Sequence, residues 1–382
     1  MRSSQQENWY PTGGRDSINM LDSVHRQSPR PPVRIWFGDR PFSSLAQSFY
    51  GCLVDDEDYR RVKNVTDAEI KVAPFCAHDL RRRHLRRANY TVLEQFMDVG
   101  PAVPCVLNAD GVEVHRRELS LGNELWLLAE SGYNSRRVSR VLYSPVTAHK
   151  NDRLPLVGGA LPIISKGRPD VGWVGRVDGV PQMGWRYHLG ISQGISRIPL
   201  SIQGMNLLIA SHAVHERSYI ANYLGYALRA KIARKLGRVL PESSILAVTV
   251  RNQMTRQQYI EHLVSRPYAL VVRGYENFAY RMYEAMSLGR IPVVIDTDVV
   301  MPLESIVPWD DICVRIPLCE LHLTGQLIQR FHDRWSPSEF RDLQYELRRW
   351  FEYFHPRRFF IDMLRRLVEC HSGTNPESGS AV

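Results

Sequence analysis

"YALVVRGYENFAYRMYEAMSLGRIPVVIDTD", residues 268–298, decides how the C-terminal half of this chain folds. The run 268–272 is rich in residues that favour strands, and 291–295 is a second run of this kind. Between them, 278–288 has helical periodicity, and Gly289 follows at a position that favours the end of a helix. The stretch is therefore predicted to be a right-handed β–α–β unit with two parallel strands.

The charged residues of this unit gather at one edge of the predicted sheet. Arg273 and Gly274 follow the first strand, and the triplet 296–298 follows the second. Open α/β sheets bind their ligands outside the carboxyl ends of the strands. We therefore expect a binding site here, although Asp296-Thr297-Asp298 itself is predicted to be a strand-end turn despite its D-x-D spelling.

The predicted helix has an apolar face with two charged residues beside it. The face predicted to pack on the sheet consists of Phe278, Met282, Ala285 and Met286. Arg281 can meet an anion that the helix N-terminus also attracts, and Glu284 can accept hydrogen bonds from two hydroxyls. A nucleoside diphosphate offers both groups. The alternative is an ion pair between Arg281 and Glu284, worth about 0.2–0.5 kcal/mol when exposed.

The rest of the chain alternates between strand-like and helix-like segments. Further strands are predicted at 33–38, 69–75, 104–111, 124–131, 171–179 and 244–250, and helices at 84–100, 214–236, 255–264, 338–354 and 356–370. This alternation predicts an α/β fold with parallel sheets that are covered on both faces.

A break at 161–170 suggests two domains, within the size range of ordinary domains. We predict a flexible arm over 1–30, an N-terminal Rossmann-like domain over 31–165, a C-terminal Rossmann-like domain over 166–340, C-terminal helices over 341–370 and a flexible tail over 371–382. The two helices at the C-terminus carry aromatic stripes, which are more typical of core packing than of ligand platforms.

Composition excludes several classes of protein. Hydrophobic residues make up 44% of the 382 and charged residues 23%, typical of a folded protein. The six cysteines show neither zinc-ligand nor disulfide-scaffold spacing, so no metal site is predicted. No run of about 18 apolar residues and no signal-peptide pattern occurs, and we expect a cytoplasmic protein.

The formal net charge of +9 favours anionic partners. The basic run "RRRHLRR" at 81–87 fits a solvated helix face as well as a polymer-binding site. No RNP, KH, zinc-finger or clear helix-turn-helix signature accompanies it, so nucleic acid is not predicted as a partner. The positive charge is also compatible with peripheral association with an anionic membrane.

The unit and the segment after it resemble the donor-binding core of the exostosin family of glycosyltransferases. The matching residues are Arg273, Gly274, Arg281, Glu284, Ala285, Gly289, Ile291, Pro292, Val293, Pro302 and Trp309. The resemblance is strong over 268–317 and loose over 33–370. It implies the GT-B architecture, in which two Rossmann-like domains face a cleft and C-terminal helices pack back across it.

The resemblance also implies an activity. It predicts transfer of a sugar from a nucleotide sugar, UDP-linked in the first instance, to a glycan or a lipid-linked acceptor, with inversion and without metal or another cofactor. Because no membrane anchor is seen and Arg290 replaces a cysteine common in the animal proteins, a bacterial or viral type of relative is expected, and heparan-type substrates are in doubt.

Carried over residue by residue, the resemblance assigns donor-binding roles. Glu284 would bind the ribose hydroxyls, Arg281 and Arg273 the diphosphate, and the backbone from Gly274 to Asn277 would approach the donor. Glu276 stands eight residues before Glu284, a spacing similar to that of retaining GT-B enzymes, so retention stays an alternative.

Other candidates come from strand ends outside the unit. Arg176, in the glycine-flanked loop after the strand at 171, is a phosphate candidate or an exposed loop arginine. An inverting transferase needs a base for the acceptor hydroxyl. Asp110 is the first choice and Asp39 and His115 follow, although Asp110 before a glycine also fits a plain turn. His78 and Asp79 follow another strand without an assigned role. The remaining alternatives are a basic nucleic-acid-binding protein and a non-catalytic protein that keeps the fold for binding.

Overall fold

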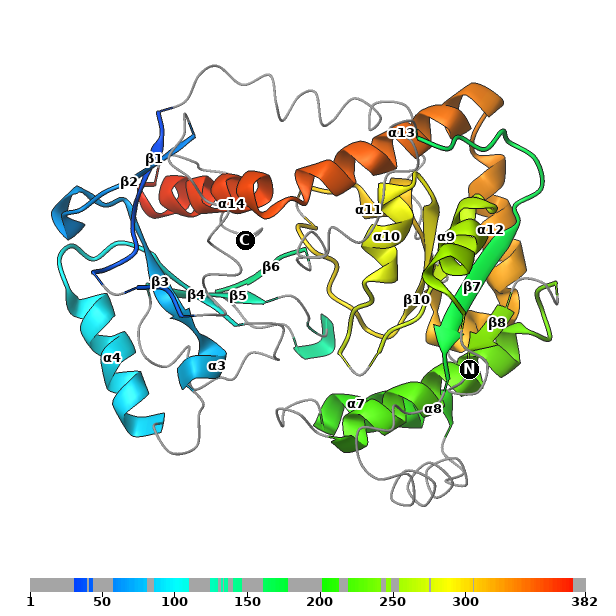
Figure 1. The fold of residues 1–382 in the computed structure, drawn as a ribbon, viewed down its shortest axis with the longest axis horizontal. Helices are drawn as coiled ribbons and strands as arrows, with labels where there is room; N and C mark the ends of the chain where they lie inside the picture. The colour runs from blue at the N-terminus through cyan, green and yellow to red at the C-terminus, as the bar shows by residue number, and fades with distance from the viewer. Residues whose placement is uncertain are drawn as a thin grey trace, which may run out of the picture.

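The computed structural model has an α/β fold built around two parallel sheets (Figure 1). The described residues are 31–39, 41–43, 58–80, 86–109, 124–129, 132, 134–136, 140–145, 161–177, 201–212, 219–241, 245–248, 254–274, 276–304 and 306–373. The predicted arm over 1–30 and most of the predicted tail lie outside them, as does most of the run 81–87.

Six strands form the N-terminal sheet, in the order β2-β1-β3-β4-β5-β6. They are β1 (Val33–Trp36), β2 (Tyr59–Arg61), β3 (Ile70–Cys76), β4 (Cys105–Asn108), β5 (Leu125–Ala129) and β6 (Val141–Tyr143), and all neighbouring pairs are parallel. The sequence predictions missed β2 and β6, because three residues are too few to show a period.

Five parallel strands form the C-terminal sheet, in the order β11-β10-β9-β7-β8. They are β7 (Val171–Arg176), β8 (Ile245–Val248), β9 (Tyr268–Val271), β10 (Ile291–Asp296) and β11 (Val314–Pro317). The predicted β–α–β unit is confirmed, since β9 and β10 pair in parallel register from Tyr268 opposite Ile291. The strand order reverses at β7, whose neighbours are β8 and β9.

Helices connect and cover these strands. The α-helices are α3 (Ala77–Leu80), α4 (Arg86–Asp98), α7 (Ile202–His212), α8 (Tyr219–Leu236), α9 (Arg256–Val264), α10 (Arg281–Ser287), α11 (Trp309–Ile312), α12 (Thr324–Asp333), α13 (Pro337–Tyr353) and α14 (Pro356–His371), and the 3-10 helices are η2 (Val65–Asp67), η3 (Asn134–Arg136) and η6 (Leu318–Leu323). In the described part of the chain, no helix combines the length and hydrophobicity that crossing a membrane requires.

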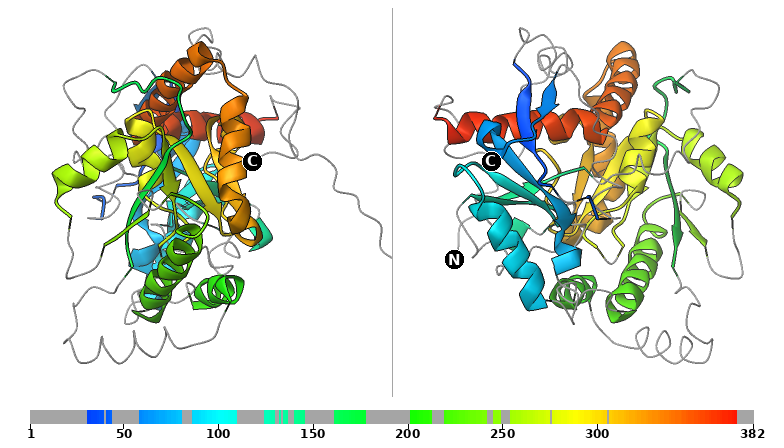
Figure 2. Two further views of the ribbon diagram at one scale, coloured as in Figure 1. Left: turned by 90° about the vertical axis from the view of Figure 1, so that its right-hand side faces the viewer. Right: turned by 60° about the vertical axis from the view of Figure 1, so that its left-hand side comes forward.

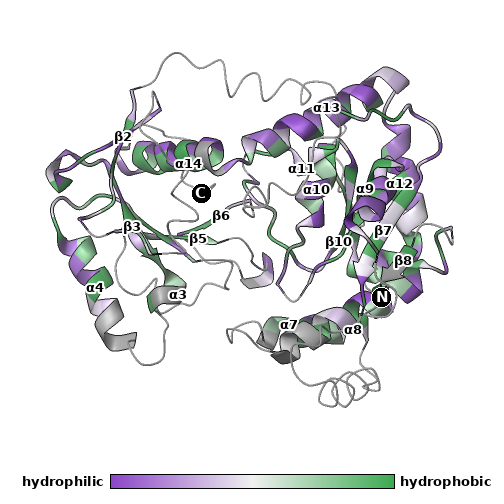
Figure 3. Ribbon diagram, in the orientation of Figure 1, coloured by the Kyte–Doolittle hydropathy of each residue, from purple (hydrophilic) through white to green (hydrophobic). Residues whose placement is uncertain are grey.

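The last two helices pass from one sheet to the other, as the resemblance to exostosins implied. Helix α13 packs against α10, and α14 packs against β1 (Figures 1 and 2). Hydrophobic and hydrophilic residues alternate along both helices in Figure 3. The buried residues of α14, such as Phe360 and Leu364, join those of both sheets in one hydrophobic cluster. These helices therefore link the two sheets through a shared core.

The segment between the two sheets is held in place by buried polar side chains. Arg290 is fully buried and its Nη2 donates to the carbonyl of Pro162. The Gln344 amide bonds both the N–H and the C=O of Ile164, at 2.9 and 2.8 Å. Burial lowers the pKa of Arg290 to about 10. The predicted boundary near 165 thus falls in a segment that is bonded to the C-terminal half.

A second contact between the sheets joins loops at their edges. Asn134 donates its backbone N–H to the Asp298 carbonyl at 2.9 Å and its side-chain Nδ2 to the Val299 carbonyl at 2.7 Å. Ser135 donates both its N–H and its hydroxyl to the Asp298 carboxylate. The two halves are therefore connected by direct hydrogen bonds as well as by α13 and α14.

Candidate functional site

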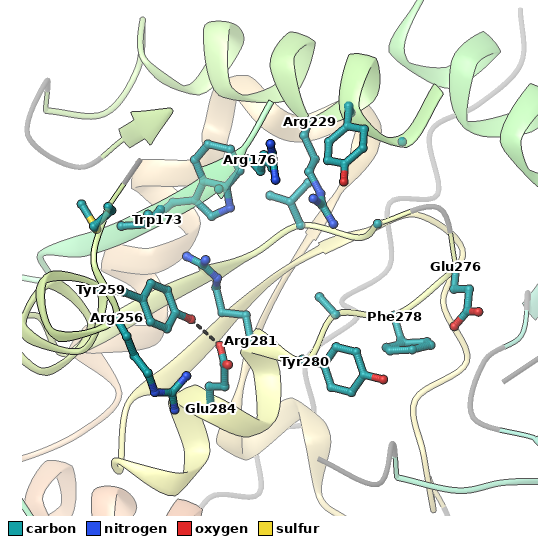
Figure 4. A pocket seen from close by; sticks show the side chains of 18 of the residues that line it. Trp173, Arg176, Arg229, Arg256, Tyr259, Glu276, Phe278, Tyr280, Arg281 and Glu284 are labelled. Atoms are coloured by element: carbon teal, nitrogen blue, oxygen red, sulfur yellow. Dashed lines mark hydrogen bonds between the residues drawn. The ribbon is translucent and has the colours of Figure 1, made fainter. Parts of the chain in front are cut away.

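A cavity of about 750 Å³ opens at the carboxyl ends of β7 and β9. This is the point where the strand order reverses, because β8 lies on the other side of β7. Doubly wound sheets bind ligands in the crevice at such a switch point. The lining residues come from β7, from the loop after β9, and from helices α8, α9 and α10 (Figure 4).

Positive charge dominates the cavity. Its lining includes four arginines and two glutamates, namely Arg176, Arg229, Arg256, Arg281, Glu276 and Glu284. Within the described residues, neither Arg229 nor Arg281 has a carboxylate partner, and each instead lies over a tyrosine ring. A guanidinium without a carboxylate keeps donors for a ligand anion. The cavity can therefore bind an anion at several points.

Arg229 is placed by the backbone of the loop after β9. Its Nε donates to the Arg273 carbonyl at 2.9 Å, and its guanidinium lies 5.6 Å from the Tyr226 ring centre. A Cβ on Gly274 would come within 2.8 Å of Arg229 Nη2, so the glycine leaves room for this guanidinium. Burial is the main cause that lowers the pKa of Arg229 to about 10, and Arg281 adds to the effect. An anion bound in the cavity would favour the charged guanidinium and so offset both effects on this pKa.

Tyr259 contacts both charged residues of α10. Its hydroxyl donates to Glu284 Oε2, and the Arg281 guanidinium carbon lies 5.1 Å from its ring centre. Arg281 and Glu284 form no ion pair with each other, so the alternative raised by their spacing is wrong. Burial also raises the pKa of Tyr259, and its hydroxyl stays a proton donor at neutral pH.

Local sequence explains how α9 presents Tyr259. Thr255 and Gln258 form a capping box, each side chain bonding the backbone N–H of the other, and this fixes where the helix begins. Arg256 and Tyr259 then lie in its first turns beside the cavity. The Trp173 indole crosses Gly175 on β7, where a Cβ would lie 1.9 Å from the ring. Glycine at 175 is thus required for this tryptophan position.

The structure brings together five of the residues predicted from the C-terminal half. Arg176, Gly274, Glu276, Arg281 and Glu284 all line the cavity. Figure 4 shows Arg281 and Glu284 beside Tyr259, whereas Glu276 lies with Phe278 and Tyr280 at another part of the lining.

Two other predicted donor-binding side chains point elsewhere. Arg273 is buried, and its Nη1 donates to Asn206 Oδ1 at 3.0 Å. Asn277 is also buried, and its Nδ2 donates to the carbonyl of Gly132, across the junction between the sheets, at 2.8 Å. Neither side chain lines the cavity. Arg273 connects the loop after β9 to helix α7, and Asn277 connects the same loop to the N-terminal half.

The predicted helix of the unit begins later than its periodicity indicated. Helix α10 starts at Arg281, so Phe278 lies before it and lines the cavity, with its ring 5.3 Å from that of Tyr280. Met282, Ala285 and Met286 are buried as predicted. With seven residues, α10 is too short to offer much of a helix dipole, so arginine side chains carry the positive charge of the site.

The D-x-D triplet is a strand-end turn, as predicted. Asp296 ends β10, and its Oδ1 accepts hydrogen bonds from the backbone N–H groups of Asp298 and Val299. Its Oδ2 pairs with Arg315 at 2.8 Å. The carboxylate of Asp298 accepts from Ser135. Both carboxylates are engaged within the chain.

Among the base candidates, Asp39 is the one that the structure describes. It is exposed and follows β1, and Gly38 makes the turn with a φ of 77° that few other residues adopt. Asp110 and His115 lie outside the described residues. His78 and Asp79 belong to the short helix α3.

Sequence reasoning missed Arg229, Arg256, Tyr259 and Trp173. Arg256 and Tyr259 had a usable signal, because they begin a helix that follows a predicted strand, and such positions lie at the ligand-binding edge. Arg229 has no such signal, since it stands in the middle of α8. Its place in the site depends on how α8 packs against the loop after β9.

Comparisons with known proteins do not assign a family. No family model and no curated protein matches the chain. Among solved structures, the sucrose-phosphate synthase (tll1590) from Thermosynechococcus elongatus is similar with a TM-score of 0.32 and 12% identity, over 94% of this chain and 78% of that one. The N-terminal domain of a Candida albicans trehalose-6-phosphate phosphatase is similar with a TM-score of 0.36 and 8% identity, over 90% and 97%. Likenesses this distant carry no information on activity.

Proposed function

We propose that the cavity binds the nucleoside diphosphate of a nucleotide sugar and that the protein is a glycosyltransferase. One observation carries this proposal: Arg229 and Arg281 line the cavity, and no described carboxylate pairs with either of them. Glu284 lines the same cavity. Diphosphate oxygens fit guanidinium donors, and ribose hydroxyls fit a carboxylate acceptor. The resemblance of 268–317 to the exostosin donor-binding core supports the same assignment.

The proposed chemistry depends on charge at the leaving group. Arg176, Arg229 and Arg281 stabilise the negative charge that develops on the departing diphosphate, the role that a metal ion has in other transferases. The acceptor, a glycan or a lipid-linked sugar, attacks the anomeric carbon with inversion while a carboxylate takes the hydroxyl proton. Asp39 is the described candidate for this base, and Asp110 and His115 remain candidates by sequence.

A retaining reaction is the second candidate, and the position of Glu276 favours it. Glu276 lines the same cavity as Glu284 but lies apart from the arginine group (Figure 4). In that case it would contact the sugar. The stereochemistry of the product at the anomeric carbon, read by NMR, separates the two reactions.

The test is a calorimetric screen of the purified chain against UDP, GDP, ADP and CDP, followed by the sugar conjugates of the base that binds. We expect saturable one-to-one binding of one nucleoside diphosphate and slow release of it from its sugar conjugate. Binding of RNA in preference to all four nucleotides would contradict the proposal and indicate a nucleic-acid-binding protein. Nucleotide binding with no turnover for any conjugate or acceptor would indicate a non-catalytic relative.

A further inference from the structure

One side chain, Tyr259, holds two charged residues of the cavity at once. It comes from α9, while Arg281 and Glu284 belong to α10. Its hydroxyl bonds Glu284 Oε2, and its ring lies under the Arg281 guanidinium (Figure 4). Its two contacts are chemically different and can be removed separately.

The ring of Tyr259 is itself fixed. It packs against a buried cluster of Leu263, Ala269, Ala285 and Leu288, which joins α9 and α10 to β9. The capping box at Thr255 fixes the start of α9 one turn before it. A side chain held in this way can orient its neighbours at little further entropic cost, because its own rotamer is already restricted.

The contact with Glu284 leaves one carboxylate oxygen available. Oε2 accepts from Tyr259, whereas no described residue donates to Oε1. A glutamate side chain that is only partly buried otherwise samples several rotamers, and each would place its oxygens differently. The Tyr259 hydroxyl therefore selects one orientation, in which Oε1 can accept a hydrogen bond from a ligand hydroxyl.

We infer that Tyr259 is the positioning residue by which this site distinguishes ribonucleotides from deoxyribonucleotides, an inference that rests on the function proposed above. Its hydroxyl orients Glu284 for a ribose hydroxyl, and its ring supports Arg281 for the diphosphate. A site built to accept a hydroxyl discriminates against the ligand that lacks it, since its polar group is then left unpaired.

The experiment compares three ligands by calorimetry: the nucleoside diphosphate selected in the screen, its 2′-deoxy counterpart and inorganic pyrophosphate. For the wild type we expect the ribonucleotide to bind about tenfold or more tightly than the deoxynucleotide, the size of one hydrogen bond to a charged group. In Tyr259→Phe, which keeps the ring, this ratio should fall to about threefold or less, while pyrophosphate affinity changes by less than about twofold. In Tyr259→Leu, pyrophosphate should also bind about two- to tenfold more weakly, because the support for Arg281 is lost.

Tyr353→Phe is the matched control. Tyr353 also donates to a carboxylate, Asp362 Oδ2 at 2.9 Å, but between α13 and α14 and away from the cavity. Removal of the Tyr353 hydroxyl should lower the free energy of unfolding as much as removal of the Tyr259 hydroxyl. It should leave the ratio of ribonucleotide to deoxynucleotide affinity unchanged.

The outcomes separate this inference from the proposed function. If no nucleoside diphosphate binds, both are wrong. If one binds but the wild type holds the deoxynucleotide equally well, the inference alone fails, and this result needs no variant to fold. An unchanged ratio in folded Tyr259→Phe also overturns it.

Discussion

The two sheets share the same arrangement of their first three strands but differ in what lies at the carboxyl ends of these strands. In each, the first strand lies between the second and the third: β2-β1-β3 in the N-terminal sheet and β8-β7-β9 in the C-terminal one. At the carboxyl ends of β7 and β9 lies a cavity lined by four arginines, whereas the loop after β1 contains Gly38 and the exposed Asp39. The strand order thus determines where a site can form, and the side chains that line this place determine its chemistry.

The largest effect is expected at the N-terminal edge. If Asp39 is the base, Asp39→Asn should slow transfer about 10²- to 10⁴-fold, because a positioned base contributes that much to proton removal. Nucleotide affinity should not change, since the nucleotide belongs to the other sheet. The measurement is release of nucleoside diphosphate from the nucleotide sugar that the screen selects. A rate within about threefold of the wild type would exclude Asp39 as the catalytic base and leave Asp110 and His115 as candidates.

The next effect is expected at the C-terminal edge. Arg281→Ala should weaken nucleoside diphosphate binding about 10- to 100-fold, as loss of hydrogen bonds from a charged group predicts. Stability should change by less than about 1 kcal/mol, because the partner that Arg281 loses is an aromatic ring. Arg341→Ala, an exposed arginine on α13, is the control for charge alone. Equal affinity in the two variants, measured by calorimetry, would place the diphosphate elsewhere.

A moderate effect is expected where the two sheets meet. Asp298→Ala should lower the free energy of unfolding by about 1–3 kcal/mol. The substitution removes the carboxylate that accepts hydrogen bonds from Ser135, and alanine disfavours the φ of 68° found at this position. Asp298→Asn should cost less, because asparagine tolerates this conformation and keeps an acceptor. Denaturant unfolding measures both. A nucleotide affinity lowered more than about threefold would show that the junction and the cavity are coupled.

The smallest effect concerns pH. Burial, with Arg266 and Arg281 nearby, lowers the pKa of His262 to about 4, whereas the unfolded chain has a value near 6.5. Between these values the unfolded state binds the additional proton, so stability should fall as the pH drops from about 6.5 to about 4. His262→Asn should show a smaller loss over this interval in unfolding experiments at pH 7 and pH 5. An identical loss in both proteins would assign the dependence to other groups.

Part of the site could be predicted from sequence because its residues are close along the chain. Arg281 and Glu284 stand one helical turn apart, and their helix follows a strand whose end lies at the predicted binding edge, so local periodicity placed them together there. The resemblance to the exostosin donor-binding core then favoured a binding role over an ion pair. Arg176 also follows directly from a strand end. These predictions need only the geometry of one β–α–β unit.

The other part could not be predicted in this way, because similar residues in the same unit have different neighbours in space. Arg273, Arg281 and Arg290 are three arginines within one stretch, yet the first bonds Asn206, the second reaches the cavity and the third bonds the segment between the sheets. Their partners come from α7, from α9 and from residue 162. No local pattern in the sequence encodes such long-range pairings.

By itself, the sequence determined the α/β class and the β–α–β unit, and it predicted the sheet edge of the candidate site and residues 281 and 284 within it. Hydrophobic periodicity and the alternation of strands with helices are properties of residues close together along the chain, so they can be recognised without knowing the tertiary contacts. Only the tertiary structure decided that Arg229 and Tyr259 join this pair, that Arg273 and Asn277 support the loop instead, and that Asp298 joins the two sheets. A charged side chain needs either a polar partner or access to solvent, and the packing of the whole chain determines which of these is present.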